Sequence, residues 1–464
     1  MTYFKPVVAW TLSTSLLTLL ACRGAGPGSD DQQILLELEH SLQTNLLATW
    51  YPAAIDSVHG GFLCDFDAEW RPNGSHHKML VTQTRHIWTT SKIAAHYDDS
   101  SYLTIAKHGV DFIRDKMWDN EFGGFFEVRD RAGNELAGAR GGSGKTAYSS
   151  AFAIYGLAAY YAVSHDSAAL DLATATFDWL EKYSRDPEFG GYFDRLERDG
   201  SLASAGDAPR AAMFAGQDHW KDYNSSIHLM EAFSELYKVW PDSLLRLRLE
   251  EMLAIVRDRL IGDKGYQTLF LERDLTPISL RDSSETFITA NYYLDHVSFG
   301  HDVETAYLLL EASHALGLQE DTQTLRVAKS LVDHTIANGW DEENGGIYDS
   351  GYYFSNADSI TILRDAKVWW GQAEALNSLL LMSQLFPHEQ RYREFFGRQW
   401  RYIKTWLIDH ERGDWYELGL DKNPEQVRAP KGRDWKVNYH NARTLINCIN
   451  MFKSEMELTG KVDF

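Results

Sequence analysis

The sequence predicts an all-α protein, an (α/α)6 barrel of six helical hairpins with short β-hairpins at one end. Three observations predict this fold class. A glycine-rich motif recurs along the chain, a pair of helix-like stretches accompanies each copy, and no linker-like segment interrupts residues 30–464. Recurrence of this kind is typical of one supersecondary unit used several times. We therefore expect residues 31–464 to form a single domain.

The recurring motif contains two glycines, then an apolar residue, then alternating aromatic and acidic residues, which together are a hairpin signal. Four copies are complete and two are degenerate. From one copy to the next, the apolar position advances by 63, 67, 74, 81 and 68 residues. In chain order the copies occupy residues 59–62, 122–125, 189–192, 264–266, 344–347 and 413–415.

Apolar residues at steps of three and four predict two helices in each unit. We expect the first helix of each pair in an outer ring and the second in an inner ring, with the inner helix starts at one mouth of the barrel. The same units could form an open solenoid with capping repeats, but we favour a closed ring. The expected pairs are 34–50 with 81–97, 101–118 with 146–163, 167–183 with 222–240, 243–261 with 301–317, 322–338 with 365–386, and 388–408 with 438–459.

The N-terminal segment is typical of a targeting signal. Lys5 precedes an apolar run that is too short to span a bilayer with ease and ends in small residues. The sequence Leu19-Leu20-Ala21-Cys22 resembles the lipobox of bacterial lipoproteins. We expect residues 1–21 to be a signal peptide, Cys22 to be lipidated, and residues 22–30 to be a flexible tether. The protein would then be anchored in the bacterial cell envelope, facing the periplasm or the cell surface; an uncleaved signal anchor is the alternative.

The composition excludes some classes of binding partner. A formal net charge of −21 makes nucleic acid a poor partner, and no basic cluster marks a membrane surface, so the lipid is the only expected membrane contact. Aromatic residues reach 13%, which suits either packing between helices or a carbohydrate site. Besides Cys22 only Cys64 and Cys448 are present, which is no disulfide framework. We expect a monomer that binds a small neutral ligand.

Polar and aromatic residues gather at the starts of the expected inner helices. One such cluster means little, but clusters on five or six helices that share one barrel mouth indicate a site. They include Arg85, Tyr148, Asn224, His228, His301, Glu304, Trp369, Trp370, Glu374, Trp435, His440 and Asn441.

Several histidines with one arginine and one glutamate suit proton transfer at carbon. An imidazole with a pKa near 7 can remove a C–H proton beside a carbonyl and return it. Arg85 and the inward-pointing helix N-termini could stabilise the enediolate. His301 and Glu304 share a helix face and could bind a metal, but no third ligand motif completes a tetrahedral site, so we expect no metal.

Three motifs resemble those of the cellobiose 2-epimerase group of the N-acylglucosamine 2-epimerase superfamily. They occupy residues 299–304, 369–374 and 435–443, in this order and on three expected helices. The resemblance covers nearly all of residues 30–460 and implies an (α/α)6 barrel that uses no cofactor. It implies epimerisation at C2 of the reducing-end sugar of a β-1,4-linked disaccharide of the cellobiose, mannobiose or lactose type.

The resemblance also implies roles for individual residues. His301 and His440 resemble the acid/base pair, with a part for His440 in ring opening, and Arg85 resembles the arginine that holds the intermediate. Glu304 would orient its neighbours, and His228 completes the catalytic set. The expected substrate contacts are Tyr148, Asn224, Trp369, Trp370, Glu374, Trp435 and Asn441.

Three other functions compete with epimerisation. A glycoside hydrolase on the same barrel would need two carboxylates across the scissile bond, for which Asp65 with Asp67, or Glu304 with Glu374, are candidates. A non-catalytic sugar-binding lipoprotein would leave the histidines idle. An aldose–ketose isomerase shares the enediolate and differs in the carbon that receives the proton.

Overall fold

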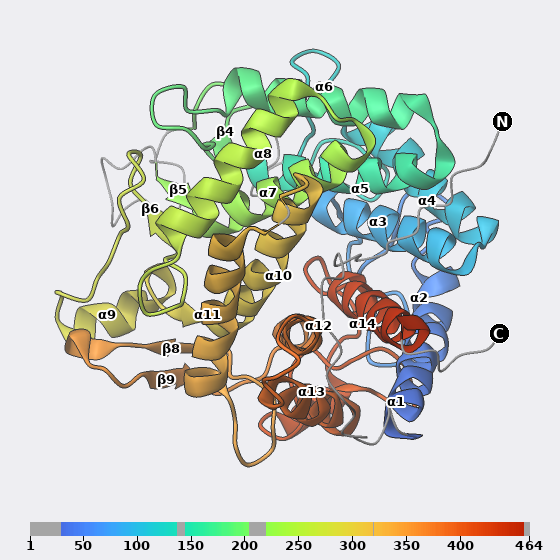
Figure 1. Ribbon diagram of the computed structural model, residues 1–464. Coiled ribbons are helices and arrows are strands. Elements are labelled where there is room, and N and C mark those ends of the chain that lie inside the picture. Colours follow the sequence, from blue (N-terminus) through green and yellow to red (C-terminus); the bar gives the residue numbers. More distant parts are fainter. Residues whose placement is uncertain (1–28, 137–143, 204–219, 319, 459–464) are drawn as a thin grey trace.

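The computed structural model describes residues 29–136, 144–203, 220–318 and 320–458 (Figure 1). The expected signal peptide, Cys22 and the tether up to residue 28 lie outside these residues. In the described part of the chain, no helix combines the length and the apolar character that crossing a bilayer requires.

Six inner helices form a closed ring, in which each helix contacts the next and the last contacts the first (Figure 1). The second helix of each expected pair is an inner helix. Each outer helix packs mainly on the inner helix that precedes it in the chain, and the first outer helix packs on the last inner helix, so the outer helices do not pack chiefly on their expected partners. The predicted (α/α)6 barrel is therefore confirmed. The inner helices are α3 (Leu80–Tyr97), α5 (Ala147–Ser164), α7 (Tyr223–Val239), α10 (Phe299–Ala315), α12 (Trp369–Leu385) and α14 (Tyr439–Leu458). The outer helices are α1 (Ser29–His40), α4 (Ser100–Phe112), α6 (Ser167–Tyr183), α8 (Ser243–Ile255), α11 (Thr322–Gly339) and α13 (Arg391–Tyr402).

Four outer helices change to a wider π-helical turn before they end. The predicted helices extend through these turns, because periodicity does not distinguish an inserted residue from a regular turn. The segments are η1 (Ser41–Leu47), η2 (Ile113–Met117), η5 (Val256–Leu260) and η8 (Ile403–Leu407). The first is followed by α2 (Ala48–Ala53), in which Tyr51 is extended at φ −117° and ψ 113°. Its successor Pro52 disfavours helical geometry at that position.

Short strands join consecutive units at the hairpin end. The residues just before an inner helix pair with residues that follow the next Gly-Gly turn, whereas the turns themselves are closed by single bridges such as Ile55 with Phe62. The expected β-ribbons thus exist, but they connect units rather than fold back on each Gly-Gly. The pairs are β1 (Lys78–Met79) with β2 (Val128–Arg129), β3 (Lys145–Thr146) with β4 (Arg195–Leu196), and β5 (Lys221–Asp222) with β6 (Phe270–Leu271); β7 (Val297–Ser298), β8 (Ser350–Tyr352) and β9 (Thr361–Arg364) form a three-stranded sheet.

A buried ion pair fixes most of these turns to the next inner helix. In the second unit, Asp119 accepts from backbone N–H groups of its own turn, while Lys145 donates to its carboxylate (3.1 Å) and to the Gly123 carbonyl. Burial of both charges is tolerable because each is paired and hydrogen-bonded. The same arrangement recurs in Asp56 with Lys78, Asp186 with Lys221, Asp341 with Lys367, and Asp409 with Lys431.

The main apolar core is continuous from Leu38 in the first outer helix to Met456 in the last inner helix. Cys64 and Cys448 are buried and unbridged, as expected. A small satellite core of Leu280, Ile288, Leu294 and Tyr352 lies under α9 (Glu285–Asn291), a short helix that was not predicted. The remaining short helices are η6 (Tyr292–Leu294), η7 (Phe354–Asn356) and η9 (Pro424–Arg428).

Candidate active site

The six inner helices start at the same mouth of the barrel, so their first turns bring together residues that are far apart in sequence. Their N-terminal dipole ends add partial positive charge there. The contributions are Arg85 from α3, Tyr148 from α5, Asn224 and His228 from α7, His301 and Glu304 from α10, Trp370 and Glu374 from α12, and His440 from α14.

His440 is buried at the start of α14 and is held by a carboxylate of the neighbouring inner helix. Its Nδ1 lies 2.7 Å from Oε1 of Glu374 and 3.9 Å from Oε1 of Glu304. Because an ionised carboxylate only accepts hydrogen bonds, the proton of neutral His440 lies on Nδ1. Nε2 then carries a lone pair that can accept a proton.

His228 is oriented in the same way from within its own helix. Its Nδ1 lies 2.8 Å from Oε2 of Glu231, three residues later on the same helix face. The imidazole is buried and packs edge-on against Tyr148, with ring centroids 5.4 Å apart. Its Nε2 is therefore also the acceptor.

His301 is half-buried and is held by a hydroxyl rather than a carboxylate. Its Nδ1 lies 2.6 Å from Oγ of Ser298, and its Nε2 lies 3.5 Å from the Tyr223 hydroxyl. The ring lies 4.5 Å from Trp370, centroid to centroid, and Trp370 lies 5.8 Å from His440. Both imidazoles thus lie near the same indole.

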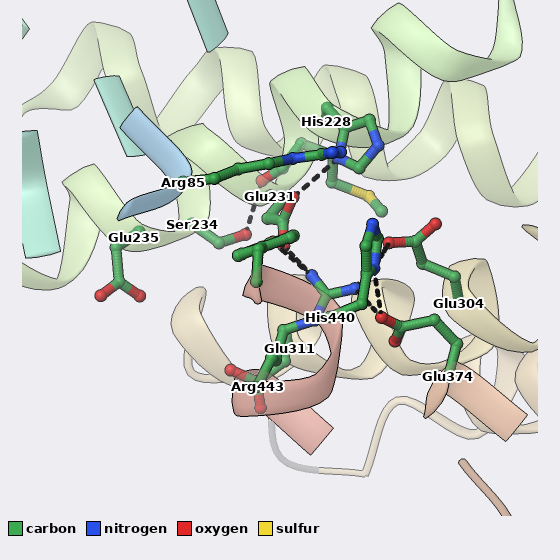
Figure 2. A network of polar contacts seen from close by, with 12 residues as sticks. Arg85, His228, Glu231, Ser234, Glu235, Glu304, Glu311, Glu374, His440 and Arg443 are labelled. Atoms are coloured by element: carbon green, nitrogen blue, oxygen red, sulfur yellow. Dashed lines mark hydrogen bonds and ion pairs between the residues drawn. The ribbon is translucent and has the colours of Figure 1, made fainter. Parts of the chain in front are cut away.

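A single guanidinium, that of Arg443, joins three carboxylates near His228 and His440 (Figure 2). Its Nη2 donates to Oε1 of Glu304 (2.5 Å) and of Glu374 (2.7 Å). Its Nη1 donates to Glu231 and to the Tyr439 hydroxyl (2.6 Å), which itself donates to Glu231 (2.9 Å). We call Arg443 with Glu231, Glu304 and Glu374 the Arg443 junction. Figure 2 shows Glu304 and Glu374 approaching it from one side and Glu231 from the other.

Burial decides the ionisation of the two imidazoles near Trp370. It lowers the pKa of His301 and of His440 well below 6.5, and the nearby Arg85 guanidinium lowers that of His440 further. Both rings are therefore neutral at neutral pH, which is the form that a base requires. Burial would raise the pKa of Glu231, but the Arg443 guanidinium holds it at about 2.

Arg85 enters the site from α3 and lies on aromatic rings. Its guanidinium carbon is 4.6 Å from the Phe152 centroid and 5.1 Å from that of Tyr439, and its Nη2 donates to the Tyr148 hydroxyl at 3.4 Å. Burial raises the pKa of Tyr148 to about 12, so this hydroxyl keeps its proton. Asn224 hydrogen-bonds the same hydroxyl. A fixed cation beside neutral donors suits an oxygen that becomes negative.

Two of the expected tryptophans are placed to contact a ligand. Trp370 is partly exposed and packs over Gly300, where a Cβ would lie 2.7 Å from the indole, which explains the glycine before His301. Trp435 is 44% exposed and lies 6.3 Å from Tyr148, centroid to centroid. Such exposed indoles offer flat apolar faces to a sugar ring.

Three expected substrate contacts have other partners. Trp369 is 4% exposed and packs in the core. Asn441 is fully buried, and its amide donates to Asp414 at 3.1 Å, which ties α14 to the turn of the last, degenerate motif copy. Glu374 is fully buried between Arg443 and His440. Because these side chains are closed off by protein, their placement does not support direct contact with a substrate.

The carboxylates of the junction do not form an open metal site. Glu304, Glu374 and His440 have ligand atoms close enough to hold a metal ion, as do Cys64, Asp65 and His76. In the first group, Arg443 donates to the very oxygens that would bind the ion. In the second, burial raises the pKa of the Cys64 thiol, and Asp65 already accepts from the backbone N–H of His76. Neither set favours a cation over its present partners.

Glu231, Tyr439 and Arg443 were not among the expected site residues. Glu231 follows His228 by three positions, and Arg443 follows His440 by three, so each pair shares a helix face. That spacing is the signal that could have indicated them. The shared partner could not be foreseen, because Glu231 and Arg443 are 212 residues apart.

A closed (α/α)6 barrel with neutral imidazoles, an arginine and exposed indoles at one mouth defines a class of sugar-converting barrel enzymes. The model of the N-acylglucosamine 2-epimerase (GlcNAc 2-epimerase) family matches residues 60–443, and the chain belongs to this family. It is a carbohydrate epimerase, and therefore an isomerase. The resemblance seen in the three motifs is thus confirmed.

The chain is similar to cellobiose 2-epimerases over almost its whole length. That of Bacteroides fragilis is 24% identical over 422 residues, covering 90% of this chain and 99% of the relative. That of Ruminococcus albus is 26% identical, covering 90% and 98%. The solved structure of cellobiose 2-epimerase from Spirochaeta thermophila superposes with a TM-score of 0.77 at 28% identity, covering 93% of this chain and 99% of that one.

Proposed function

We propose that the protein epimerises C2 of the reducing-end sugar of a β-1,4-linked disaccharide. The observation that carries this proposal is the pair of neutral imidazoles, His301 and His440, which both lie near Trp370 at the mouth of the barrel. Two bases that face one carbon from opposite sides can remove a proton from one face and return one to the other. The similarity to cellobiose 2-epimerases along nearly their full length supports a disaccharide as the substrate.

The reaction starts with opening of the sugar ring, in which Nε2 of His440 takes the proton of the C1 hydroxyl and the ring oxygen gains a proton from water. Nε2 of His301 then takes the C2 proton, and the C–H electron pair forms the enediolate as charge moves onto the C1 oxygen. The His440 imidazolium donates its proton to the other face of C2 and the carbonyl re-forms. The ring closes as the former ring hydroxyl returns its proton to solvent and the C1 oxygen takes a proton from the His301 imidazolium. No atom is lost, and the two histidines exchange roles between the forward and reverse directions.

The other residues stabilise and orient these groups. Arg85 and the Tyr148 hydroxyl supply a cation and a donor for the enediolate oxygens. Glu374 accepts from His440 Nδ1 and stabilises the imidazolium form. Trp370 and Trp435 hold the two sugar rings, and Glu304 acts through Arg443.

Hydrolysis fits the same residues less well. A hydrolase needs one carboxyl group on each side of the scissile bond, whereas Glu304 and Glu374 both bind the same Nη2 of Arg443. The other candidate pair, Asp65 with Asp67, forms hydrogen bonds within its own loop. Asp65 accepts from the backbone N–H of His76, and Asp67 accepts from Arg71.

Product analysis tests the proposal. Residues 23–464 are incubated separately with cellobiose, mannobiose, lactose, mannose and N-acetylglucosamine, and products are separated and weighed by mass spectrometry. We expect a new disaccharide of unchanged mass whose reducing end is inverted at C2. Release of monosaccharides would support a hydrolase, a 2-ketose product would support an isomerase, and conversion of the monosaccharides alone would overturn the disaccharide assignment.

We also propose that Cys22 carries the lipid that holds the enzyme in the cell envelope, as the Leu-Leu-Ala-Cys sequence suggests. Several acyl chains on one cysteine anchor a protein stably. Expression of the full chain in a bacterium with a labelled fatty acid should label the protein, and Cys22→Ser should abolish both the label and membrane fractionation. A labelled Cys22→Ser variant, or a soluble unlabelled parent, would contradict the anchor.

A further inference from the structure

We propose that Arg443 is a positioning residue that couples the protonation of His228 to that of His440. The inference rests on the proposed function, since it assigns these imidazoles to proton transfer. Arg443 is 0% exposed. It acts through the carboxylates to which the imidazoles are bonded.

The coupling follows from the contacts of one guanidinium. On one side, Nη1 donates to Oε1 of Glu231, whose Oε2 holds Nδ1 of His228. On the other side, Nη2 donates to Oε1 of Glu374, and that same oxygen accepts from Nδ1 of His440. The imidazoles on α7 and α14 are thus joined through three intervening groups, which are Glu231, Arg443 and Glu374.

The charges make this connection sensitive to protonation. The junction contains three buried carboxylates and one buried cation. Arg85 is a second cation near His440, and one negative charge remains in excess, which favours a further positive charge in the vicinity. Either imidazole can supply that charge, bonded to its own carboxylate. Once one ring is protonated, part of the excess negative charge is neutralised, and protonation of the other becomes less favourable.

A planar guanidinium is required for this geometry. Its two outer nitrogens diverge toward Glu231 on one side and toward Glu304 and Glu374 on the other, and Tyr439 fixes the fork by accepting from Nη1. A lysine ammonium at this position keeps the charge but presents its donors from one point. The conservative replacement therefore separates the charge of Arg443 from its geometry.

The experiment combines imidazole titration by NMR with pH profiles of turnover, in protein labelled at histidine. The variants are Arg443→Gln, Arg443→Lys and the control Lys92→Met, which breaks an ion pair with Glu235 elsewhere on the inner ring. His228→Gln and His440→Gln assign the two resonances.

We expect Arg443→Gln to raise the titration midpoints of both His228 and His440 by about one pH unit or more, because a nearby cation is lost. The low-pH limb of the kcat/KM profile should move to higher pH by a similar amount. The value of kcat should fall at least about 100-fold, while KM changes little. In a protein that keeps Arg443, His440→Gln should raise the titration midpoint of His228. Arg443→Lys should keep the midpoints but lower kcat and change the Nδ1–H resonances of both rings together.

The inference is overturned if the two midpoints in folded Arg443→Gln match those of wild type, or if only one moves. If Arg443→Gln does not fold, the Nδ1–H resonances of His228 and His440 in Arg443→Lys test the coupling instead. A change in the resonance of only one of the two rings would contradict it. Lys92→Met should leave all midpoints unchanged. Because NMR titration needs no substrate, the coupling can be judged even if the wild-type protein converts no disaccharide, which would remove only the proposed function.

Discussion

At the scale of single residues, the hydrogen bond from His440 Nδ1 to Glu374 fixes which nitrogen faces the substrate. A carboxylate in this position also stabilises the imidazolium that forms when Nε2 takes a proton, as in other histidine–carboxylate pairs. Because Glu374 is fully buried, its effect is exerted on His440 and not on the sugar.

Glu374→Gln should therefore lower kcat by about 10²- to 10⁴-fold and leave KM within a few-fold of wild type. The amide can still accept from Nδ1, but the charge that stabilises the imidazolium is gone. Steady-state kinetics with the disaccharide checks this result. Glu311→Gln is the matched control, because Glu311 is also an inner-helix carboxylate, on α10, but forms its ion pair with Lys238. This variant should keep the wild-type kcat and KM. A large rise in KM with unchanged kcat would instead make Glu374 a substrate contact.

Trp435 is the most exposed tryptophan among the residues that the structure describes, at 44%. Trp435→Ala should raise KM by about tenfold, corresponding to about 1.4 kcal/mol of lost stacking, with a smaller effect on kcat and none on thermal stability. Trp435→Phe keeps a flat face and should recover most of the affinity. Equal KM values for all three proteins would show that the ring does not bind the sugar.

At the scale of elements, the Gly-Gly turns place the inner helices. Each turn ends in residues that lead to the next inner helix, and the buried aspartate–lysine pair fixes the turn against that helix start. The position of the catalytic groups on the first helical turns thus depends on pairs that lie outside the site.

Lys145→Met should lower the free energy of unfolding by about 1–3 kcal/mol, because Asp119 loses its buried ammonium partner and keeps only the Arg198 guanidinium. Lys107→Met breaks an exposed i,i+4 pair with Asp111 and should change stability by about 0.5 kcal/mol or less. Urea unfolding of both variants measures the difference. Similar losses in the two variants would contradict the role of the buried pair.

The sequence was sufficient to predict the twelve helices and the barrel, since apolar steps of three and four residues are a local signal. The site was predicted in part: His301, His440, His228 and Arg85 converge as expected, because the helix starts share one end. The strand pairs between units could not be predicted, since each has two or a few residues and a partner some fifty residues away. Arg443 is the last residue of the motif at 435–443, but its three carboxylate partners lie on α7, α10 and α12, and no local pattern connects them.

At the scale of the whole molecule, several imidazoles are buried in the neutral form. Burial lowers the pKa of His86 to about 3 and those of His296 and His334 to about 4, in addition to His301 and His440. In the unfolded chain these groups titrate near 6.5. Below that pH the unfolded chain binds protons that the folded protein does not, so stability is complete above pH 6.5 and is lost as the pH falls.

The free energy of unfolding should therefore decrease between pH 6.5 and pH 4.5, with a slope of about 1.4 kcal/mol per pH unit for each such histidine. Urea unfolding at half-unit intervals measures the slope. His86→Gln should decrease this slope by about 1.4 kcal/mol per pH unit, the contribution of one histidine. The variant also loses the hydrogen bond to the Tyr51 hydroxyl and is less stable at pH 7. A stability that stays constant over this range would mean that these rings are protonated in the folded state.

The central claim is that His301 and His440 exchange a proton at C2, and incubation with cellobiose in deuterated water tests it most directly. Proton NMR follows the reducing end in wild type, His301→Ala and His440→Ala. We expect a mannose-type reducing end with deuterium at C2 in the wild-type reaction and neither product nor deuterium in the variants. An inverted product without deuterium from solvent, or full activity in either variant, would contradict the assignment of these two histidines.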